Sequence, residues 1–69
     1  MSWSWNYRVV KRDDVFAIHE VYYKGDKIVA ISDDSIEPCG ESFDELSNDV
    51  HLFTLAIKNP VLSYDDIEY

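Results

Sequence analysis

Three side chains have the chemistry of a catalytic or metal-binding site: Cys39, His19 and His51. Cys39 lies in a loop with Glu37 and Glu41 close by on either side. A thiol becomes a nucleophile when a neighbouring base favours the thiolate, and either histidine could supply that base. A chain this short seldom forms the cleft that an enzyme needs, and a structural zinc site takes four ligands. The sequence therefore predicts an ordinary loop cysteine, surface imidazoles, no enzyme and no cofactor.

Paired carboxylates occur at Asp13–Asp14, Asp33–Asp34 and Asp65–Asp66. Carboxylate pairs can collect a divalent cation. None of these pairs has the alternating oxygen spacing of a calcium-binding loop. We expect them to be solvated turn and tail residues, and we predict no metal site.

Aromatic residues are concentrated in segments with strand character. Aromatic side chains on strands can also form a surface on which nucleic-acid bases stack. Such stacking surfaces come with a basic groove, whereas this chain has 14 acidic residues and only 6 basic ones. A net charge of −8 repels phosphate and attracts basic proteins. The sequence predicts no direct contact with nucleic acid, and it assigns the aromatic residues to the core. Those residues are Trp3, Trp5, Tyr7, Tyr22 and Tyr23.

The length of 69 residues suffices for one domain with one core. A domain of this size buries only about 60% of its unfolded surface, so it is marginally stable alone. Cys39 is the single cysteine, which excludes an internal disulfide and fits a reducing compartment. Association, with a second copy or with another protein, is the expected source of further stability. With no long apolar run and no signal-like start, we expect a cytoplasmic protein that does not enter a membrane.

The pattern of apolar residues predicts an α+β fold, with three antiparallel strands followed by one helix packed on one face of the sheet. Alternation marks a strand over 3–9, and dense β-branched and aromatic runs mark strands over 15–23 and 28–31. Gly25 suits the positive φ of a type II′ turn between the last two. Residues 60–64 can add a short fourth edge strand. We expect a single domain over 1–64 and an acidic tail over 65–69.

A helix is predicted after residue 42. Ser42 and Glu45 have the spacing of a capping box, and Pro60 limits the far end. Apolar residues recur at helical spacing and predict the face that packs on the sheet. They are Phe43, Leu46, Val50, Phe53 and Ile57.

Two-residue turns at 13–14 and 25–26 predict the pairing of the strands. Trp5 then opposes Tyr22, Val9 opposes Ile18, and Tyr22 opposes Val29. These residues share the face on which the helix should pack. Glu20 falls on the same face, where we expect it to reach the sheet edge or to accept a hydrogen bond from an aromatic donor such as Trp5 or Tyr7.

The opposite face of the sheet carries apolar residues that a single helix cannot cover, and two leucines lie outside the main helical face. Exposed apolar surface of this extent usually meets a partner. The candidate interface residues are Val10, Ala17, Val21, Tyr23, Ile28, Leu52 and Leu55.

Two resemblances add to this interpretation. Residues 5–10, 17–23, 40–42 and 59–62 resemble a family of short bacterial proteins without a known activity. The order of three strands, then Cys39-Gly40-Glu41-Ser42-Phe43-Asp44-Glu45-Leu46 opening a helix, resembles HicB-type antitoxin N-terminal domains. That second resemblance covers about residues 5–62. It implies a protein that binds and blocks a small basic RNA-cleaving toxin, and that commonly oligomerises.

The sequence thus favours a small acidic protein-interaction module without enzymatic activity. Its partners would be a second copy, as a homodimer, or a basic protein, as in an antitoxin-like complex. The alternative is a mimic of nucleic acid that occupies a DNA- or RNA-binding protein. A mimic needs carboxylates spaced along one face, whereas an antitoxin-like binder needs an apolar patch with an acidic rim.

Overall fold

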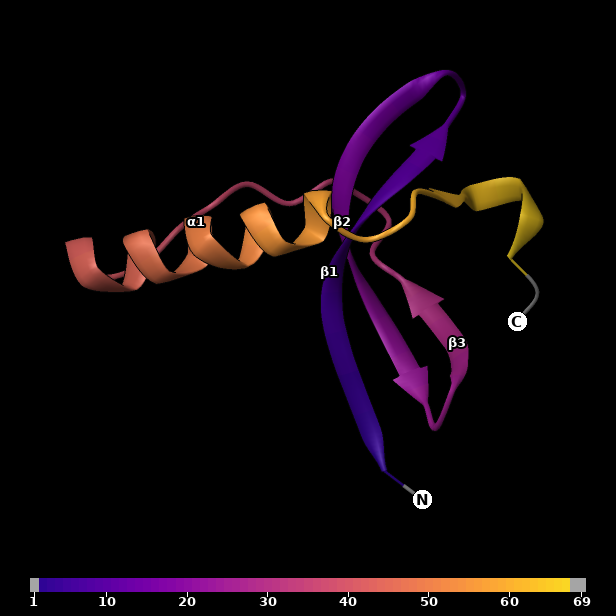
Figure 1. Cartoon of the computed structure of the whole chain (residues 1–69), viewed down its shortest axis with the longest axis horizontal. Coiled ribbons are helices and arrows are strands. Elements are labelled where there is room, and N and C mark those ends of the chain that lie inside the picture. Colours follow the sequence, from indigo (N-terminus) through magenta and orange to yellow (C-terminus); the bar gives the residue numbers. More distant parts are fainter. Residues whose placement is uncertain (1, 68–69) are drawn as a thin grey trace.

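A computed structural model describes residues 2–67 as a four-stranded sheet with one α-helix and one short 3₁₀ helix (Figure 1). The order of the strands in the sheet is β3-β2-β1-β4, with the first three antiparallel and β4 parallel to β1. This confirms the predicted α+β class and the short fourth strand. The elements are β1 Trp3–Arg12, β2 Val15–Lys24, β3 Lys27–Ile31, α1 Phe43–Ile57, β4 Leu62–Ser63 and the 3₁₀ helix η1 Tyr64–Asp66.

The hairpin of β1 and β2 follows the predicted register over its whole length. Trp5 pairs with Tyr22 and Val9 with Ile18, as expected from a two-residue turn. Asp13 and Asp14 both have positive φ, 52° and 65°. Two consecutive left-handed residues are the signature of a type I′ turn, which matches the twist of the flanking strands, and aspartate tolerates that conformation.

The pairing of β2 with β3 departs from the prediction. Gly25 has φ 62° as expected, and the register is regular next to the turn. Beyond Tyr23 it shifts by one residue, so Tyr22 pairs with Ala30 and not with Val29. The predicted partner was wrong because Val29 is the extra residue of a β-bulge, which increases the local twist of the strand.

The helix α1 lies on one side of the sheet and projects away from it, so that its first two turns stand clear and it meets the strands from Asp49 onward (Figure 1). Its residues that are buried or half-buried are Asp49, Leu52, Phe53 and Ala56. The predicted packing face was therefore wrong by about one residue step, about 100° around the helix. Of the five predicted residues, only Phe53 is half-buried, while Phe43, Leu46, Val50 and Ile57 are exposed.

Specific contacts explain this rotation. The ring of Tyr7 packs against Phe53 with 4.7 Å between centroids, and its hydroxyl donates to Asp49 at 2.8 Å. Ala56 is 1% exposed, and its small side chain allows the helix to approach the sheet closely. A hydrophobic pattern identifies apolar residues that need burial, but hydrogen bonds and side-chain size decide which face meets the sheet.

The second face of the sheet is covered by the C-terminal segment, on the side opposite α1 (Figure 1). Val10 and Val21 are 0% exposed, and Val10 pairs with Leu62 of β4. Both were predicted to lie in an exposed interface, and that prediction was wrong because the sheet curls and residues 60–67 close over it. Sequence patterns do not show this closure, because the covering segment is only two strand residues and one 3₁₀ turn.

The predicted tail starts within this covering segment. Residues 65 and 66 belong to η1, which contacts β1, and the guanidinium of Arg12 lies 4.4 Å from the ring centre of Tyr64. Residues 68 and 69 of the predicted tail lie outside the described residues. The folded part therefore continues at least to residue 67.

The apolar core is small for the size of the chain. Among residues 2–67 the buried hydrophobic residues are Val9, Val10, Val21 and Ala56. The chain exposes 5162 Å², whereas a compact monomer of 8.1 kDa is expected to expose about 4,500 Å². The molecule thus shows about 700 Å² more surface than a compact monomer of this mass.

Candidate interaction surfaces

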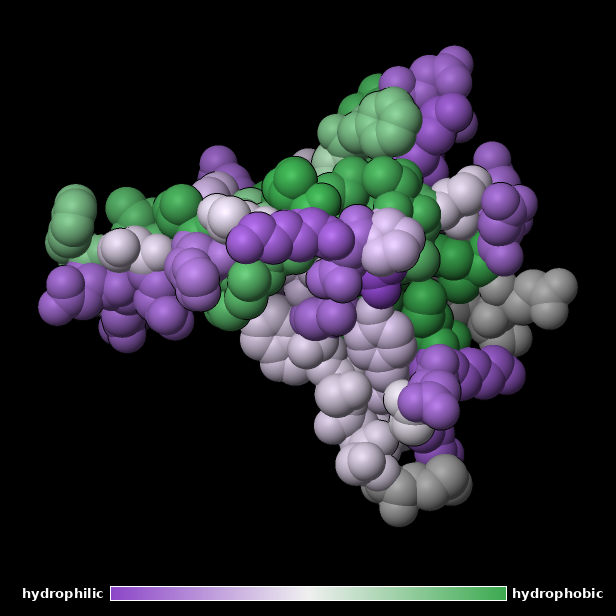
Figure 2. Space-filling model, viewed as in Figure 1, coloured by the Kyte–Doolittle hydropathy of each residue, from purple (hydrophilic) through white to green (hydrophobic). Residues whose placement is uncertain are grey.

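An apolar stripe runs along the exposed side of α1. Its members are Phe43, Leu46, Val50 and Ile57, which are 82%, 36%, 46% and 66% exposed. They follow each other at intervals of three, four and seven residues, so they share one face of the helix. We name this set the α1 stripe. Figure 2 shows hydrophobic surface following one side of α1 and continuing onto the sheet.

A groove of about 390 Å³ connects the α1 stripe to the sheet. Phe53 and Ile57 form its helical wall, and Val9 and Ile18 lie on the sheet side. Phe16 also borders it and is 62% exposed, which extends the apolar surface along β2. The stripe and the groove together form one continuous apolar surface that spans helix and sheet.

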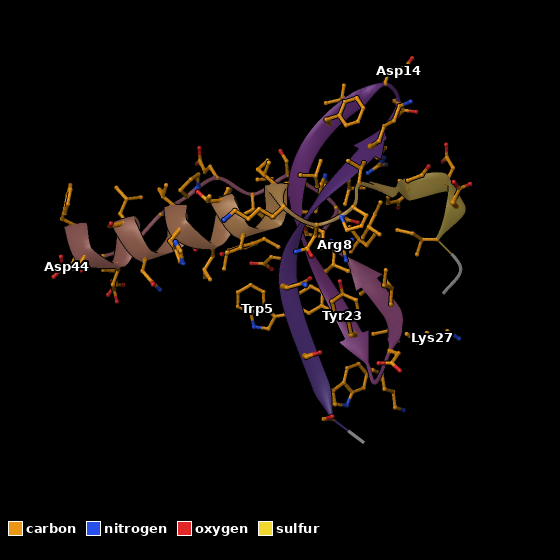
Figure 3. The ribbon with its side chains drawn as sticks, in the orientation of Figure 1. Trp5, Arg8, Asp14, Tyr23, Lys27 and Asp44 are labelled. Atoms are coloured by element: carbon orange, nitrogen blue, oxygen red, sulfur yellow. The ribbon has the colours of Figure 1, made fainter. Side chains whose placement is uncertain are left out.

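Acidic residues accompany the N-terminal half of this surface. Asp44 and Glu45 lie in the first turn of α1, and Asp44 marks its far end in Figure 3. Ser42 caps the helix as predicted by accepting from the Glu45 N–H at 3.1 Å. The Glu45 carboxylate accepts from the Glu41 N–H at 2.8 Å, one residue earlier than the predicted capping box. The helix that carries the α1 stripe therefore also carries carboxylates in its first turn, on its other sides.

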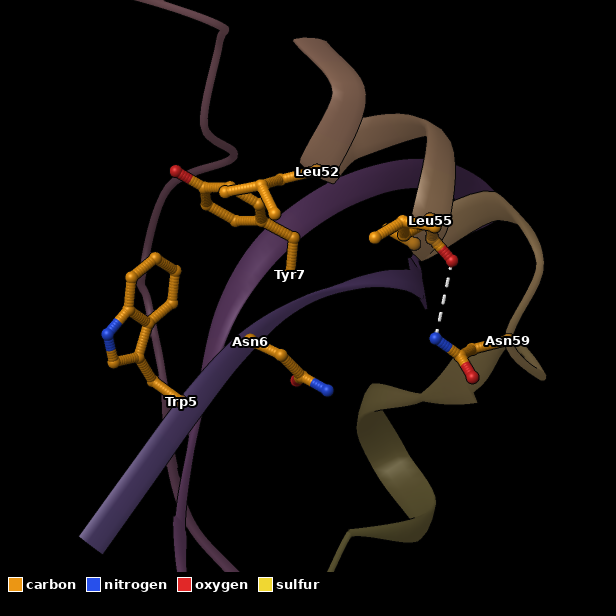
Figure 4. A pocket seen from close by; sticks show the side chains of 7 residues that line it. Trp5, Asn6, Tyr7, Leu52, Leu55 and Asn59 are labelled. Atoms are coloured by element: carbon orange, nitrogen blue, oxygen red, sulfur yellow. Dashed lines mark hydrogen bonds between the residues drawn. The ribbon is translucent and has the colours of Figure 1, made fainter. Parts of the chain in front are cut away.

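A second pocket, of about 450 Å³, lies where the C-terminal part of α1 passes β1 (Figure 4). Trp5 and Tyr7 contribute aromatic rings and Leu52 and Leu55 contribute aliphatic side chains, while Ala56 also lines it. Two carboxamides, Asn6 and Asn59, complete the lining. We name this site the edge pocket. It contains Leu52 and Leu55, two of the predicted interface residues.

The other predicted interface residues lie apart from one another. Ala17 borders the groove, and Ile28 lines a shallow pocket with the C-terminal segment. Tyr23 lies near Arg8 (Figure 3) and donates to Asn6 at 2.9 Å. The structure therefore does not unite the predicted residues in one surface.

The residues first considered for catalysis are also separated. Cys39 is exposed, and its backbone N–H donates to Asp49 at 3.0 Å. His19 is 5% exposed on the other face of the sheet, with Nδ1 3.0 Å from the Ser32 carbonyl, so the expectation of a surface imidazole was wrong for this residue. His51 is exposed on α1. Within residues 2–67 no three metal-ligating side chains cluster.

Two tyrosines on the helix-covered face are tied to carboxylates. Burial first, and then the hydrogen bond and charge of Asp49, raise the pKa of Tyr7 from 10.0 to about 12. Tyr22 donates to Glu20, and this hydrogen bond, followed by burial, raises the pKa of Tyr22. Glu20 thus accepts from an aromatic donor as expected, although the donor is Tyr22 and not Trp5 or Tyr7.

Sequence reasoning found the α1 stripe but assigned it to the core, and it missed the edge pocket. The signal for the stripe was the helical spacing itself, which does not reveal what covers it. The edge pocket depends on residues from two elements whose contact no local pattern encodes. Among residues 2–67 no helix is long and apolar enough to cross a membrane. No protein-family model, no curated protein and no solved structure matches the chain.

Proposed function

We propose that this chain is an acidic protein-interaction module without enzymatic activity, and that its α1 stripe binds a basic protein. The observation that carries the proposal is the exposure of four large apolar residues on one face of a helix that projects from the sheet. Apolar surface of this kind marks interaction sites. An amphipathic helix with anchors at helical spacing is a recurrent way of filling a groove on another protein.

The charge of the chain supports a basic partner. The net charge is −8, and Asp44 and Glu45 lie in the first turn of α1, the helix that carries the stripe. Opposite charges accelerate encounter and align the two proteins, while the buried apolar residues supply affinity. The resemblance to HicB-type antitoxins gives the narrowest form of the proposal, in which the partner is a small basic RNA-cleaving protein. We place this activity in the cytoplasm, which the single Cys39 fits.

A binding assay with defined probes tests the proposal. One probe is a labelled amphipathic peptide with leucines on one helical face and lysines on the other. The second probe has the same residues in scrambled order and hence the same charge. Fluorescence anisotropy should show at least about tenfold tighter binding of the amphipathic peptide, since only this peptide can bury its leucines against the α1 stripe. Binding should weaken as salt rises from about 50 to about 500 mM, because salt screens the charge attraction.

A pair of variants on the same helix assigns the site. Val50→Asn places a polar group within the α1 stripe and should reduce binding of the amphipathic peptide to the level of the scrambled one. Asn48→Ala alters an exposed residue on the opposite side of the helix and should leave binding unchanged. Equal binding of both peptides to the wild-type chain would contradict the proposal. That result would favour the nucleic-acid mimic, which relies on charge alone.

A further inference from the structure

One edge of β1 is open along the N-terminal half of the strand. β2 pairs with all ten residues of β1 on one side, whereas on the other side β4 pairs only with Val10 and Lys11. The Ser2 carbonyl accepts from the Gly25 N–H at 3.1 Å, so the even-numbered residues of this strand direct their backbone groups toward β2. Because the direction alternates, Trp3, Trp5 and Tyr7 direct theirs away.

These outward groups have no hydrogen-bond partner within residues 2–67. Proteins usually protect such an edge with a charged side chain, a proline or a bulge. Residues 2–7 contain no charge and no proline, and the pairing of β1 with β2 has no bulge. Trp3 and Trp5 are 68% and 51% exposed on this unprotected edge. We name residues 3–7 with their outward backbone groups the β1 edge.

The edge pocket lies directly beside the β1 edge and offers one donor and one acceptor (Figure 4). The Tyr23 hydroxyl accepts from Arg8 at 3.3 Å, so its own proton goes to Asn6 Oδ1, and Asn6 Nδ2 remains available. Asn59 Nδ2 donates to the Leu55 carbonyl at 3.3 Å, which leaves Asn59 Oδ1 available. A donor and an acceptor beside an apolar pocket suit a peptide segment that carries a large apolar side chain.

We propose that a second copy of this chain occupies the β1 edge. The two β1 strands pair antiparallel about a two-fold axis, which joins the two four-stranded sheets into one. The outward groups of one copy meet the identical groups of the other, so the edge is complementary to itself. An aromatic side chain from the N-terminal end of the other β1 enters the edge pocket, between Trp5 and Leu55.

Charge selects a second copy over a basic partner at this site. Two chains of net charge −8 repel each other, and this repulsion opposes association least where the surface carries no charge. Neither residues 2–7 nor the lining of the edge pocket contains a charged side chain. A basic peptide would find no carboxylate there, whereas α1, the helix of the stripe, carries Asp44 and Glu45 in its first turn.

The exposed area agrees with this assignment. Each chain shows about 700 Å² more surface than a compact monomer of its mass, and a stable interface buries about 800 Å² on each partner. The β1 edge is separate from the α1 stripe, so the dimer would present two copies of the stripe. The inference therefore does not depend on what the α1 stripe binds.

Sedimentation and hydrogen exchange on the wild-type chain test this dimer. At about 100 μM in about 0.15 M salt the chain should sediment as a dimer, and dimerisation should strengthen with added salt because like charges are screened. Hydrogen exchange should show protection of the Trp3, Trp5 and Tyr7 amides that is lost on dilution. The amides of Asn6 and Arg8 face β2 and should stay protected at every concentration.

Two variants separate this edge from other surfaces. Trp5→Lys places a charge on the β1 edge and should raise the dimer dissociation constant at least about tenfold. Phe16→Lys changes another exposed aromatic residue, 62% against 51% for Trp5, away from this edge and should leave the dimer intact. The proposal would be overturned if the wild-type chain is monomeric at about 100 μM. It would also be overturned if the hydrogen-exchange rates of the Trp3 and Trp5 amides do not depend on protein concentration. A dimer that survives Trp5→Lys and dissociates with Val50→Asn would also overturn it, and would assign dimerisation to the α1 stripe.

Discussion

The hydroxyl of Tyr7 on β1 and the carboxylate of Asp49 on α1 are joined by a hydrogen bond of 2.8 Å. The second oxygen of the same carboxylate accepts from the backbone N–H of Cys39 at 3.0 Å. One side chain thus connects the sheet, the helix and the loop that leads into the helix. Because α1 meets the sheet only from Asp49 onward, this connection helps to set the direction in which the helix projects. The position of the α1 stripe depends on that direction.

The Tyr7–Asp49 bond predicts a loss of stability at high pH. The pKa of Tyr7 is raised from 10.0 to about 12 by folding, so the folded state holds its proton more tightly than the unfolded state. The resulting stabilisation is complete below about pH 10 and is lost as the pH rises toward 12. Tyr7→Phe keeps the ring but has no proton to lose. Urea unfolding at about pH 8 and about pH 11 should show a smaller decrease in the free energy of unfolding for the variant. Equal decreases would contradict this assignment.

Removal of the Asp49 carboxylate should destabilise the chain at neutral pH as well. Asp49→Ala leaves the Tyr7 hydroxyl and the Cys39 N–H without their acceptor, which should cost about 1–3 kcal/mol. The pKa of Tyr7 should also fall back toward 10.0, which ultraviolet titration measures. Asn48→Ala is the matched control on the neighbouring residue, since the side chain of Asn48 is exposed and forms no hydrogen bond within residues 2–67. If the free energies of unfolding of Asp49→Ala and Asn48→Ala are equal, the hydrogen bonds of Asp49 to Tyr7 and Cys39 contribute nothing to stability in solution.

The rotation of α1 predicts which helix positions matter for stability. Ala56→Leu adds bulk at a contact that is 1% exposed and should cost about 1–3 kcal/mol through overpacking. Leu46→Ala removes a side chain of the α1 stripe and should cost less than about 1 kcal/mol in the monomer. If the stripe packed on the sheet as the sequence pattern suggests, Leu46→Ala would cost about 2–5 kcal/mol. Thermal unfolding of both variants at low protein concentration decides between these arrangements.

The parts of the fold that the sequence predicts are those fixed by neighbouring residues. The Asp13–Asp14 turn determines the pairing of β1 with β2, because a two-residue turn leaves one register. Ser42 starts the helix because its side chain satisfies the backbone N–H of Glu45. In both cases the interacting groups are close in the chain, and their spacing alone identifies the geometry.

The remaining features depend on contacts between distant residues. The bulge at Val29, the approach of Ala56 to β1 and the burial of Val10 by the C-terminal segment all arise from tertiary packing. Periodicity separates apolar from polar positions. It does not distinguish a residue that is buried within its own chain from one that is buried only when another protein binds. For this reason the same stripe that was predicted as core is here the main candidate interaction surface.

Gly40 provides a further test, because it lies where the loop passes closest to the start of α1. A Cβ at this position would lie 2.4 Å from the Leu46 nitrogen and 2.8 Å from the Glu45 carbonyl carbon. Both atoms belong to the helix backbone, so they cannot move aside without disturbing its first turns.

Gly40→Ala should therefore push the loop away from α1, weaken the bond from the Cys39 N–H to Asp49 and cost about 1–3 kcal/mol. The matched control is Gly25→Asn. Gly25 has a positive φ that asparagine tolerates, and nothing lies within 4 Å of its added Cβ. The melting temperature should fall for Gly40→Ala by several degrees more than for Gly25→Asn, and the Cys39 amide should exchange faster in the first variant. The loop does not pack against the helix as described if Gly40→Ala has the melting temperature of the wild-type chain and the Cys39 amide keeps its protection from exchange. In that case Asp49 joins only β1 and α1.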